Sequence, residues 1–173
     1  MTRDGNRYPF QLELDSTDPG RVLDAVRSLG ESGDLEAVPP LLHLLKTTQE
    51  HRIRDAAAVA LRDLGDSRAI GPLVELISDP RTDRHRGTLL YALEGFNCLE
   101  FIPNLVELVI TGGFEVSRQA LLVIENVEGE VAPIVLSQCI KRIEDAMAIA
   151  SEDKRPLLEE LWDMFSSTDS SLE

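Results

Sequence analysis

The sequence has few cysteines, few basic residues and no long apolar run. Its 173 residues include two cysteines, which are not spaced as a Cys-x-x-Cys pair. This excludes a disulfide scaffold and a zinc site built on cysteine. No apolar run approaches the roughly 20 residues that span a bilayer, and residues 1–15 lack the apolar core of a secretory signal. We therefore expect a cytoplasmic protein with no transmembrane helix.

Basic residues are outnumbered, since 17 Lys and Arg stand against 31 Asp and Glu, for a net charge of −14. Residues 1–86 carry 15 acidic and 12 basic side chains, whereas residues 87–173 carry 16 and 5. Nucleic acids and anionic membranes are disfavoured as partners, because binding to them depends on Lys and Arg. The charge favours a basic protein partner. Alternatively, it serves only solubility.

The length of 173 residues indicates one domain, and the 43% of apolar residues indicates that it is folded. Segments of this domain repeat along the chain. Segments that begin at Asp34, Asp66 and Cys98 align at a spacing of 32 residues, and a fourth begins near Glu130. A second recurring segment lies between them. Apolar residues recur at helical spacing in both kinds of segment. This pattern predicts helices over 19–30, 35–47, 51–64, 67–78, 83–96, 99–111, 114–127, 130–149 and 152–166.

The ends of several helices carry residues that are typical of helix caps. Asp34 and Asp66 are placed to accept the free N–H groups at the start of a helix. Gly30, Gly65 and Asn97 follow predicted helix ends, where we expect a left-handed backbone. Paired helices of this kind bury their apolar faces by stacking on their neighbours.

The layout resembles HEAT repeats, in particular the short variety found in phycobilisome lyases. Two sets of residues carry the resemblance: the prolines of each first helix and the arginines early in each second helix. They are Pro39, Pro40, Pro72, Pro103 and Pro133, and Arg54, Arg86 and Arg118. The resemblance implies an all-α fold, an α-solenoid (superhelix) of about four helical hairpins with capping helices.

The ends of the chain depart from the repeat. Phe10, Leu12 and Leu14 alternate with polar residues, so we expect residues 1–18 to form an extended N-terminal segment. Residues 19–166 then form the HEAT-like repeat domain. Leu158, Leu161, Trp162 and Phe165 form a helical stripe that closes the core, and residues 167–173 form a disordered tail.

Residues capable of catalysis are present, but their spacing does not define a site. We expect His43 on the outer face of its helix and His51 and His85 at helix starts, and none of the three as a metal ligand. Cys98 and Cys139 are interpreted as core residues. Adjacent carboxylates point in different directions on a helix, so they form no acid–base pair. We predict no catalytic residue, no metal, no cofactor and no enzymatic activity.

The resemblance implies that the second helix of each hairpin lines a concave face. Combined with helical phase, it places eight residues there: Arg27, Asp55, Val59, Arg62, Tyr91, Glu94, Leu122 and Glu125. Val59, Tyr91 and Leu122 occupy matching positions and would form an apolar seam. A register shifted by one residue would instead bury all three in the core.

We therefore predict a protein-binding module that takes a partner, basic in character, on this face. It would act as an adaptor or as a stoichiometric inhibitor, such as the immunity protein of a bacterial toxin. The alternative is a bilin lyase, or a lyase subunit, of the phycobilisome-lyase type. Nothing in the sequence fixes the oligomeric state.

Overall fold

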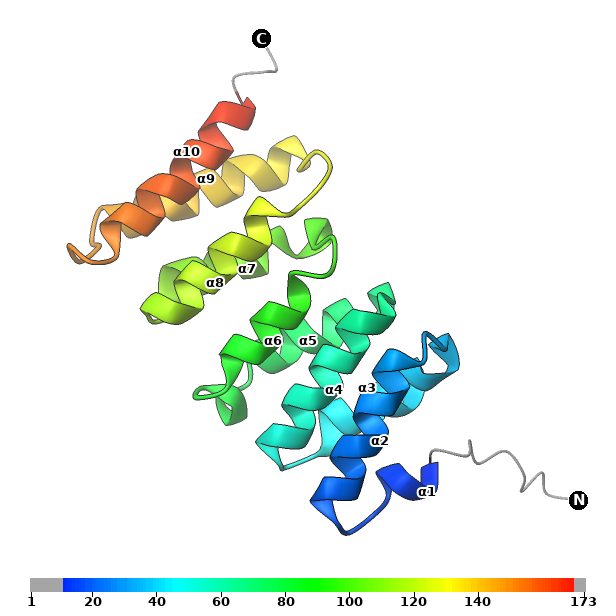
Figure 1. Ribbon diagram of the computed structural model, residues 1–173. Coiled ribbons are helices and arrows are strands. Elements are labelled where there is room, and N and C mark those ends of the chain that lie inside the picture. The colour runs from blue at the N-terminus through cyan, green and yellow to red at the C-terminus, as the bar shows by residue number, and fades with distance from the viewer. Residues whose placement is uncertain (1–10, 170–173) are drawn as a thin grey trace, which may run out of the picture. The chain divides into compact units, whose positions relative to one another are not determined.

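The computed structural model describes residues 11–169, and residues 1–10 and 170–173 lie outside the described part. The described residues form helices and connecting turns (Figure 1). They divide into two compact units, Met1–Gly95 and Phe96–Glu173, here called the N-terminal and C-terminal units. No described helix is long and apolar enough to cross a bilayer.

The N-terminal unit is built of two layers of helices. Its helices are α1 (Gln11–Leu14), α2 (Pro19–Glu31), α3 (Val38–Thr47), α4 (His51–Leu64), α5 (Ile70–Ile77) and α6 (Arg86–Leu93). One layer holds α2, α4 and α6 side by side, while α3 and α5 lie behind them (Figure 1). Each hairpin thus stacks on the next within this unit, which is the packing of an α-solenoid.

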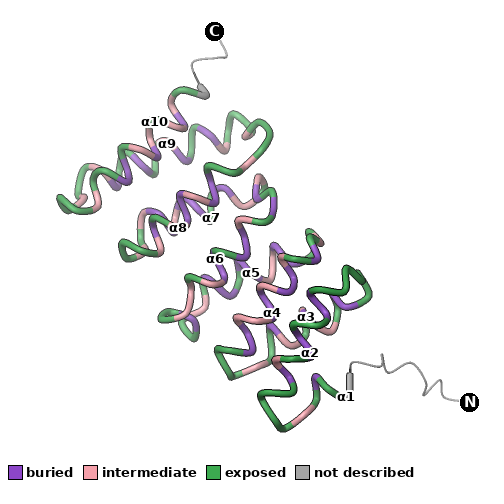
Figure 2. Tube along the Cα trace, in the orientation of Figure 1, coloured by how far each residue is buried: buried purple, intermediate pink, exposed green. Residues whose placement is uncertain are grey.

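The C-terminal unit contains α7 (Ile102–Thr111), α8 (Phe114–Glu125), α9 (Pro133–Met147) and α10 (Arg155–Asp169). Helix α7 packs on α8, α9 packs on α10, and α9 also contacts α7. Buried positions recur along each of these helices and those of the N-terminal unit (Figure 2). The predicted all-α fold of solenoid type is confirmed, and so are the predicted positions of its helices, to within a few residues at their ends.

Both predicted aspartate caps are confirmed. Asp34 Oδ1 accepts a hydrogen bond from the N–H of Glu36, and Asp66 Oδ1 accepts one from the N–H of Arg68, each at 2.9 Å. Each aspartate starts one turn of 3₁₀ helix (Leu35–Ala37 and Ser67–Ala69), and the α-helix follows. The prolines Pro39 and Pro72 then fall near the start of α3 and α5, where a residue without an N–H is tolerated.

Of the three predicted left-handed helix ends, the structure has one. Gly65 has φ 67° and caps α4 as predicted. Gly30 instead lies inside α2, where an added Cβ would be 2.9 Å from the Ala60 Cα on α4, so its role is the close approach of two helices. Asn97 does not have a positive φ either. Its side chain binds the backbone of another loop.

The ends of the chain differ from the prediction where the structure describes them. Residues 11–14 form the short helix α1 rather than an extended segment, and this turn buries Leu14 against α2. Phe10 lies outside the described residues. Helix α10 continues to Asp169, so residues 167–169 of the predicted tail are helical. In the predicted closing stripe, Leu158, Leu161 and Phe165 are buried, whereas Trp162 is half-buried and donates to Glu144 Oε1 at 3.3 Å. The single repeat domain over residues 19–166 stays a prediction.

Candidate functional site

The predicted partner-binding residues of the N-terminal unit lie on the layer formed by α2, α4 and α6. Tyr91 is 46% exposed and Val59 is half-buried. In the C-terminal unit, Leu122 of α8 is also half-buried. A register shifted by one residue would bury all three in the core. None of the three is a core residue, so the structure does not have that register. Their helices position them in this way because Ala57, Ala58, Ala60 and Leu61 of α4 and Leu89, Leu90, Ala92 and Leu93 of α6 fill the core.

A groove of about 320 Å³ runs along this layer between α2 and α4. Leu23, Ala56 and Val59 contribute apolar lining, here called the apolar floor, and Thr88 of α6 also lines the groove. Its charged lining consists of Arg27 and three carboxylates, Glu31, Asp55 and Asp63. The groove thus combines apolar surface with an excess of negative charge.

Some of the residues that line the groove were predicted as contact residues and others were not. The prediction contained Arg27, Asp55 and Val59, but it missed Glu31 and Asp63. Residues four apart on a helix share a face. Continuing from Arg27 by four residues reaches Glu31, and continuing from Val59 reaches Asp63. The sequence therefore held the signal for both.

Arg62 and Tyr91 were predicted as separate contact residues, and the structure brings them together. The Arg62 Cζ lies 3.9 Å from the centroid of the Tyr91 ring, which is a cation–π contact. Gly95 leaves room for the arginine, since a Cβ there would be 2.5 Å from the Arg62 Cγ. The buried Nη1 of Arg62 has no hydrogen-bond partner. Through this contact, the half-buried Arg62 of α4 and the exposed Tyr91 of α6 join the two helices at the surface.

Asp55 is a half-buried acidic residue of the groove. Burial raises the pKa of its carboxyl, while the charges of Arg54, His85 and His51 oppose that rise. Its Oδ1 is buried and has no hydrogen-bond partner. His51 and His85 stack on each other nearby, with ring centroids 4.2 Å apart. Asp55 therefore lines the groove with a partly buried carboxyl group that lies near Arg54 and the two histidines.

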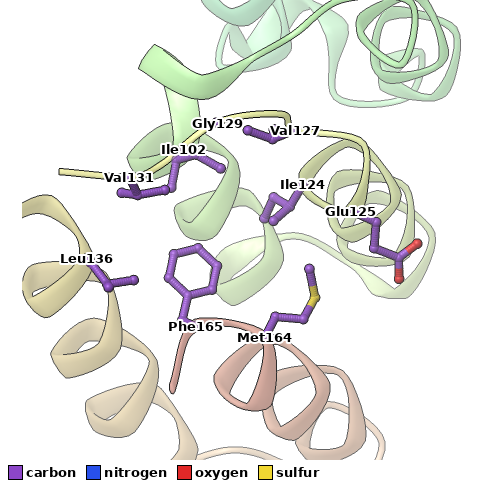
Figure 3. A pocket seen from close by; sticks show the side chains of 9 residues that line it. All are labelled: Ile102, Ile124, Glu125, Val127, Gly129, Val131, Leu136, Met164 and Phe165. Atoms are coloured by element: carbon purple, nitrogen blue, oxygen red, sulfur yellow. The ribbon is translucent and has the colours of Figure 1, made fainter. Parts of the chain in front are cut away.

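The other charged residues of the prediction lie at exposed or half-buried positions. Arg27 and Asp24 lie 3.7 Å apart on the exposed side of α2. Glu94 is half-buried at the end of α6. Glu125 of the C-terminal unit is exposed at the rim of a separate apolar pocket (Figure 3).

The remaining residues capable of catalysis are His43 and the two cysteines. His43 is exposed on α3. Cys98 and Cys139 are buried, and burial raises the pKa of the Cys98 thiol to about 11 and raises that of Cys139. Within residues 11–169, His, Cys, Asp and Glu side chains form no group of three that could hold a metal ion.

Comparison with known proteins agrees with the stacked hairpins. Residues 13–94 match the family of HEAT repeats. None of the curated proteins matches the chain. The matched residues cover the hairpins of the N-terminal unit and the groove between α2 and α4. Residues 13–94 of the chain are therefore recognised as HEAT repeats.

Proposed function

We propose that this protein is a non-enzymatic binding module for a basic protein partner. HEAT repeats generally mediate contacts between proteins. Within that role we infer the action of an adaptor or of a stoichiometric inhibitor, in the cytoplasm. The proposed contact residues are Arg27, Asp55, Val59, Arg62, Tyr91 and Glu94 in the N-terminal unit and Leu122 and Glu125 in the C-terminal unit.

The groove between α2 and α4 is the observation that supports this proposal most. Its apolar floor offers area for hydrophobic contact, and Glu31, Asp55 and Asp63 offer three carboxylates against the single cation of Arg27. Protein interfaces commonly combine an apolar centre with a polar rim, and Tyr is frequent among their anchors. A basic side chain from a partner would neutralise the excess charge.

The test is affinity capture at two salt concentrations with the full chain as bait. We expect a basic protein to bind at 50 mM NaCl and to be largely lost at 500 mM, because salt screens charged contacts. Asp63→Lys and Tyr91→Arg should each reduce capture at low salt, with melting temperatures close to that of the unchanged protein. Glu36→Lys makes the same change of charge outside the groove and should capture normally.

Three results would contradict the proposal. If the same amount of partner is captured at both salt concentrations, charged contacts do not hold the partner. A large fall in melting temperature for Tyr91→Arg would make Tyr91 a structural residue. Tight binding of a linear tetrapyrrole, seen as a change in its visible absorption, would favour the bilin-lyase alternative.

A further inference from the structure

The C-terminal unit has a pocket that is distinct from the groove. It is bounded by α7, α8, α9, α10 and the loop of residues 126–132 (Figure 3). Ile102, Ile124, Leu136 and Phe165 line its inner part, and Val127 and Val131 line it from the loop. Its volume is about 180 Å³. The side chains that line the pocket are apolar except for that of Glu125 at its rim, although polar atoms also contribute to its surface.

The loop that forms one wall is held in place by Asn97. The Asn97 side-chain amide donates to the Glu128 carbonyl at 2.8 Å, and the Glu128 N–H donates to Asn97 Oδ1 at 3.3 Å. Gly129 has φ 111°, and a Cβ there would lie 3.1 Å from Leu99 Cδ2. This fixed backbone turns Val127 and Val131 toward the pocket. The wall is thus built into the fold.

The size of the pocket sets what it can take. An apolar cavity of roughly 150 Å³ accepts a benzene molecule. The pocket at about 180 Å³ therefore has room for one phenyl ring or one branched aliphatic side chain. Filling it would remove apolar surface from water, which is the main favourable term in such contacts.

The charge around the pocket sets what must flank that side chain. The carboxylate of Glu125 lies at the rim and points away from the apolar side chains (Figure 3). Glu128 and Glu130 are exposed on the loop beside it. Residues 96–173 carry 15 acidic and 5 basic side chains. These carboxylates would repel a fatty acid, or an apolar side chain that has acidic neighbours. They would attract an apolar side chain that has Lys or Arg beside it.

We infer that this pocket binds a Phe- or Leu-type side chain of a basic protein segment, with an adjacent Lys or Arg at Glu125. The pocket shares only Glu125 with the proposed contact residues, and none of its lining residues lines the groove of the N-terminal unit. Its occupation therefore does not depend on that groove.

Three capped tripeptides test the inference on the full chain: Lys-Phe-Lys, Lys-Ala-Lys and Glu-Phe-Glu. Binding is followed by NMR of the Ile and Val methyl groups. We expect Lys-Phe-Lys to shift the methyl signals of Ile124, Val127 and Val131 in a saturable way. The other two peptides should bind about tenfold more weakly or worse, since each lacks one of the two recognised features.

Three variants locate the binding. Val131→Trp fills the pocket and should abolish the shifts at Ile124. Glu125→Lys should weaken Lys-Phe-Lys several-fold and strengthen Glu-Phe-Glu. Glu152→Lys is the control, because it makes the same change of charge at an exposed site before the start of α10. The pocket residue Phe165 lies toward the other end of that helix, so Glu152→Lys should bind the peptide normally. If Val131→Trp fails to fold, the comparison of Glu125→Lys with Glu152→Lys still decides whether the peptide binds at the pocket.

Other results would overturn the inference. Equal affinity for Lys-Phe-Lys and Lys-Ala-Lys would mean that the pocket takes no side chain. Shifts at Val59 in place of Val131 would assign the peptide to the groove. If the peptide binds only after residues 170–173 have been removed, Leu172 of the chain itself, and not a partner, is the occupant of the pocket. Because no partner protein is used, failure here leaves the proposed function standing, and the converse also holds.

Discussion

Gly30 is the residue at which α2 and α4 come closest. An added Cβ would lie 2.9 Å from both the Cα and the Cβ of Ala60, and the first of these belongs to the backbone. Alanine normally stabilises a helix by about 0.5–1 kcal/mol over glycine. Here the clash is larger, so we expect Gly30→Ala to lower the free energy of unfolding by about 1–3 kcal/mol. Urea titration followed by circular dichroism measures this change.

Gly87 provides the matched control for that substitution. It lies in α6, and a Cβ there would have nothing within 4 Å. Gly87→Ala should therefore be neutral or stabilise by up to about 1 kcal/mol. Equal effects of the two substitutions would show that the contact between α2 and α4 can relax freely.

Single residues also show where sequence reasoning fails. Asp34 and Asp66 act through atoms two residues away, so their roles follow from local sequence. Gly30 and Asn97 act on Ala60 and Glu128, about thirty residues further along the chain. A helix-end pattern cannot contain that information. Both were consequently misread as left-handed helix ends.

At the scale of the helix, Asp66 links stability to pH. Hydrogen bonds from the Arg68 side chain and from its backbone N–H lower the pKa of Asp66 to about 2, below the ordinary value of 3.8. A lowered pKa means that the stabilisation is present above pH 4 and is lost as the pH falls toward 2. Asp66→Asn keeps an acceptor but does not titrate. We expect it to be less stable at pH 6 by up to about 1 kcal/mol.

The same difference should shrink steadily between pH 4 and pH 2. Urea unfolding of both proteins at pH 6, 4 and 3 measures it. Because the two proteins share all other carboxylates, their general acid denaturation cancels in the comparison. A difference that stays constant with pH would mean that Arg68 does not favour the charged carboxylate.

The loop of residues 126–132 depends on one side chain outside it. Asn97→Ala removes both hydrogen bonds to Glu128, so we expect a loss of about 1–2 kcal/mol and faster hydrogen exchange at the Glu128 amide. Asn104→Ala, at an exposed position of α7, should leave that exchange rate unchanged. Unaltered exchange in Asn97→Ala would mean that other contacts hold the loop.

Helices and binding surface differ in how far they could be predicted. The bounds of α4, predicted as 51–64, are those observed, since apolar residues at helical spacing and a following glycine define it locally. The groove was found in part, through Asp55 and Val59 on one face of that helix. The contact of Arg62 with Tyr91 and the wall formed by Val131 depend on how helices pack. Such packing has no periodic signal in the sequence.

The molecule as a whole carries a net charge of −14, and this excess opposes its compact state. Ion pairs such as those of Arg118 with Glu160 (3.0 Å) and Arg142 with Glu107 (2.7 Å) are exposed, and pairs of this kind contribute little to stability.

Salt should therefore screen more repulsion than attraction. We expect the melting temperature to rise by roughly 2–4 °C between 10 and 200 mM NaCl, which corresponds to about 1 kcal/mol at this chain length. Most of the rise should occur below about 0.2 M, because the screening length has by then fallen from about 30 Å to under about 8 Å. A linear rise up to 1 M would indicate general salting-out, and a fall would mean that the ion pairs outweigh the repulsion.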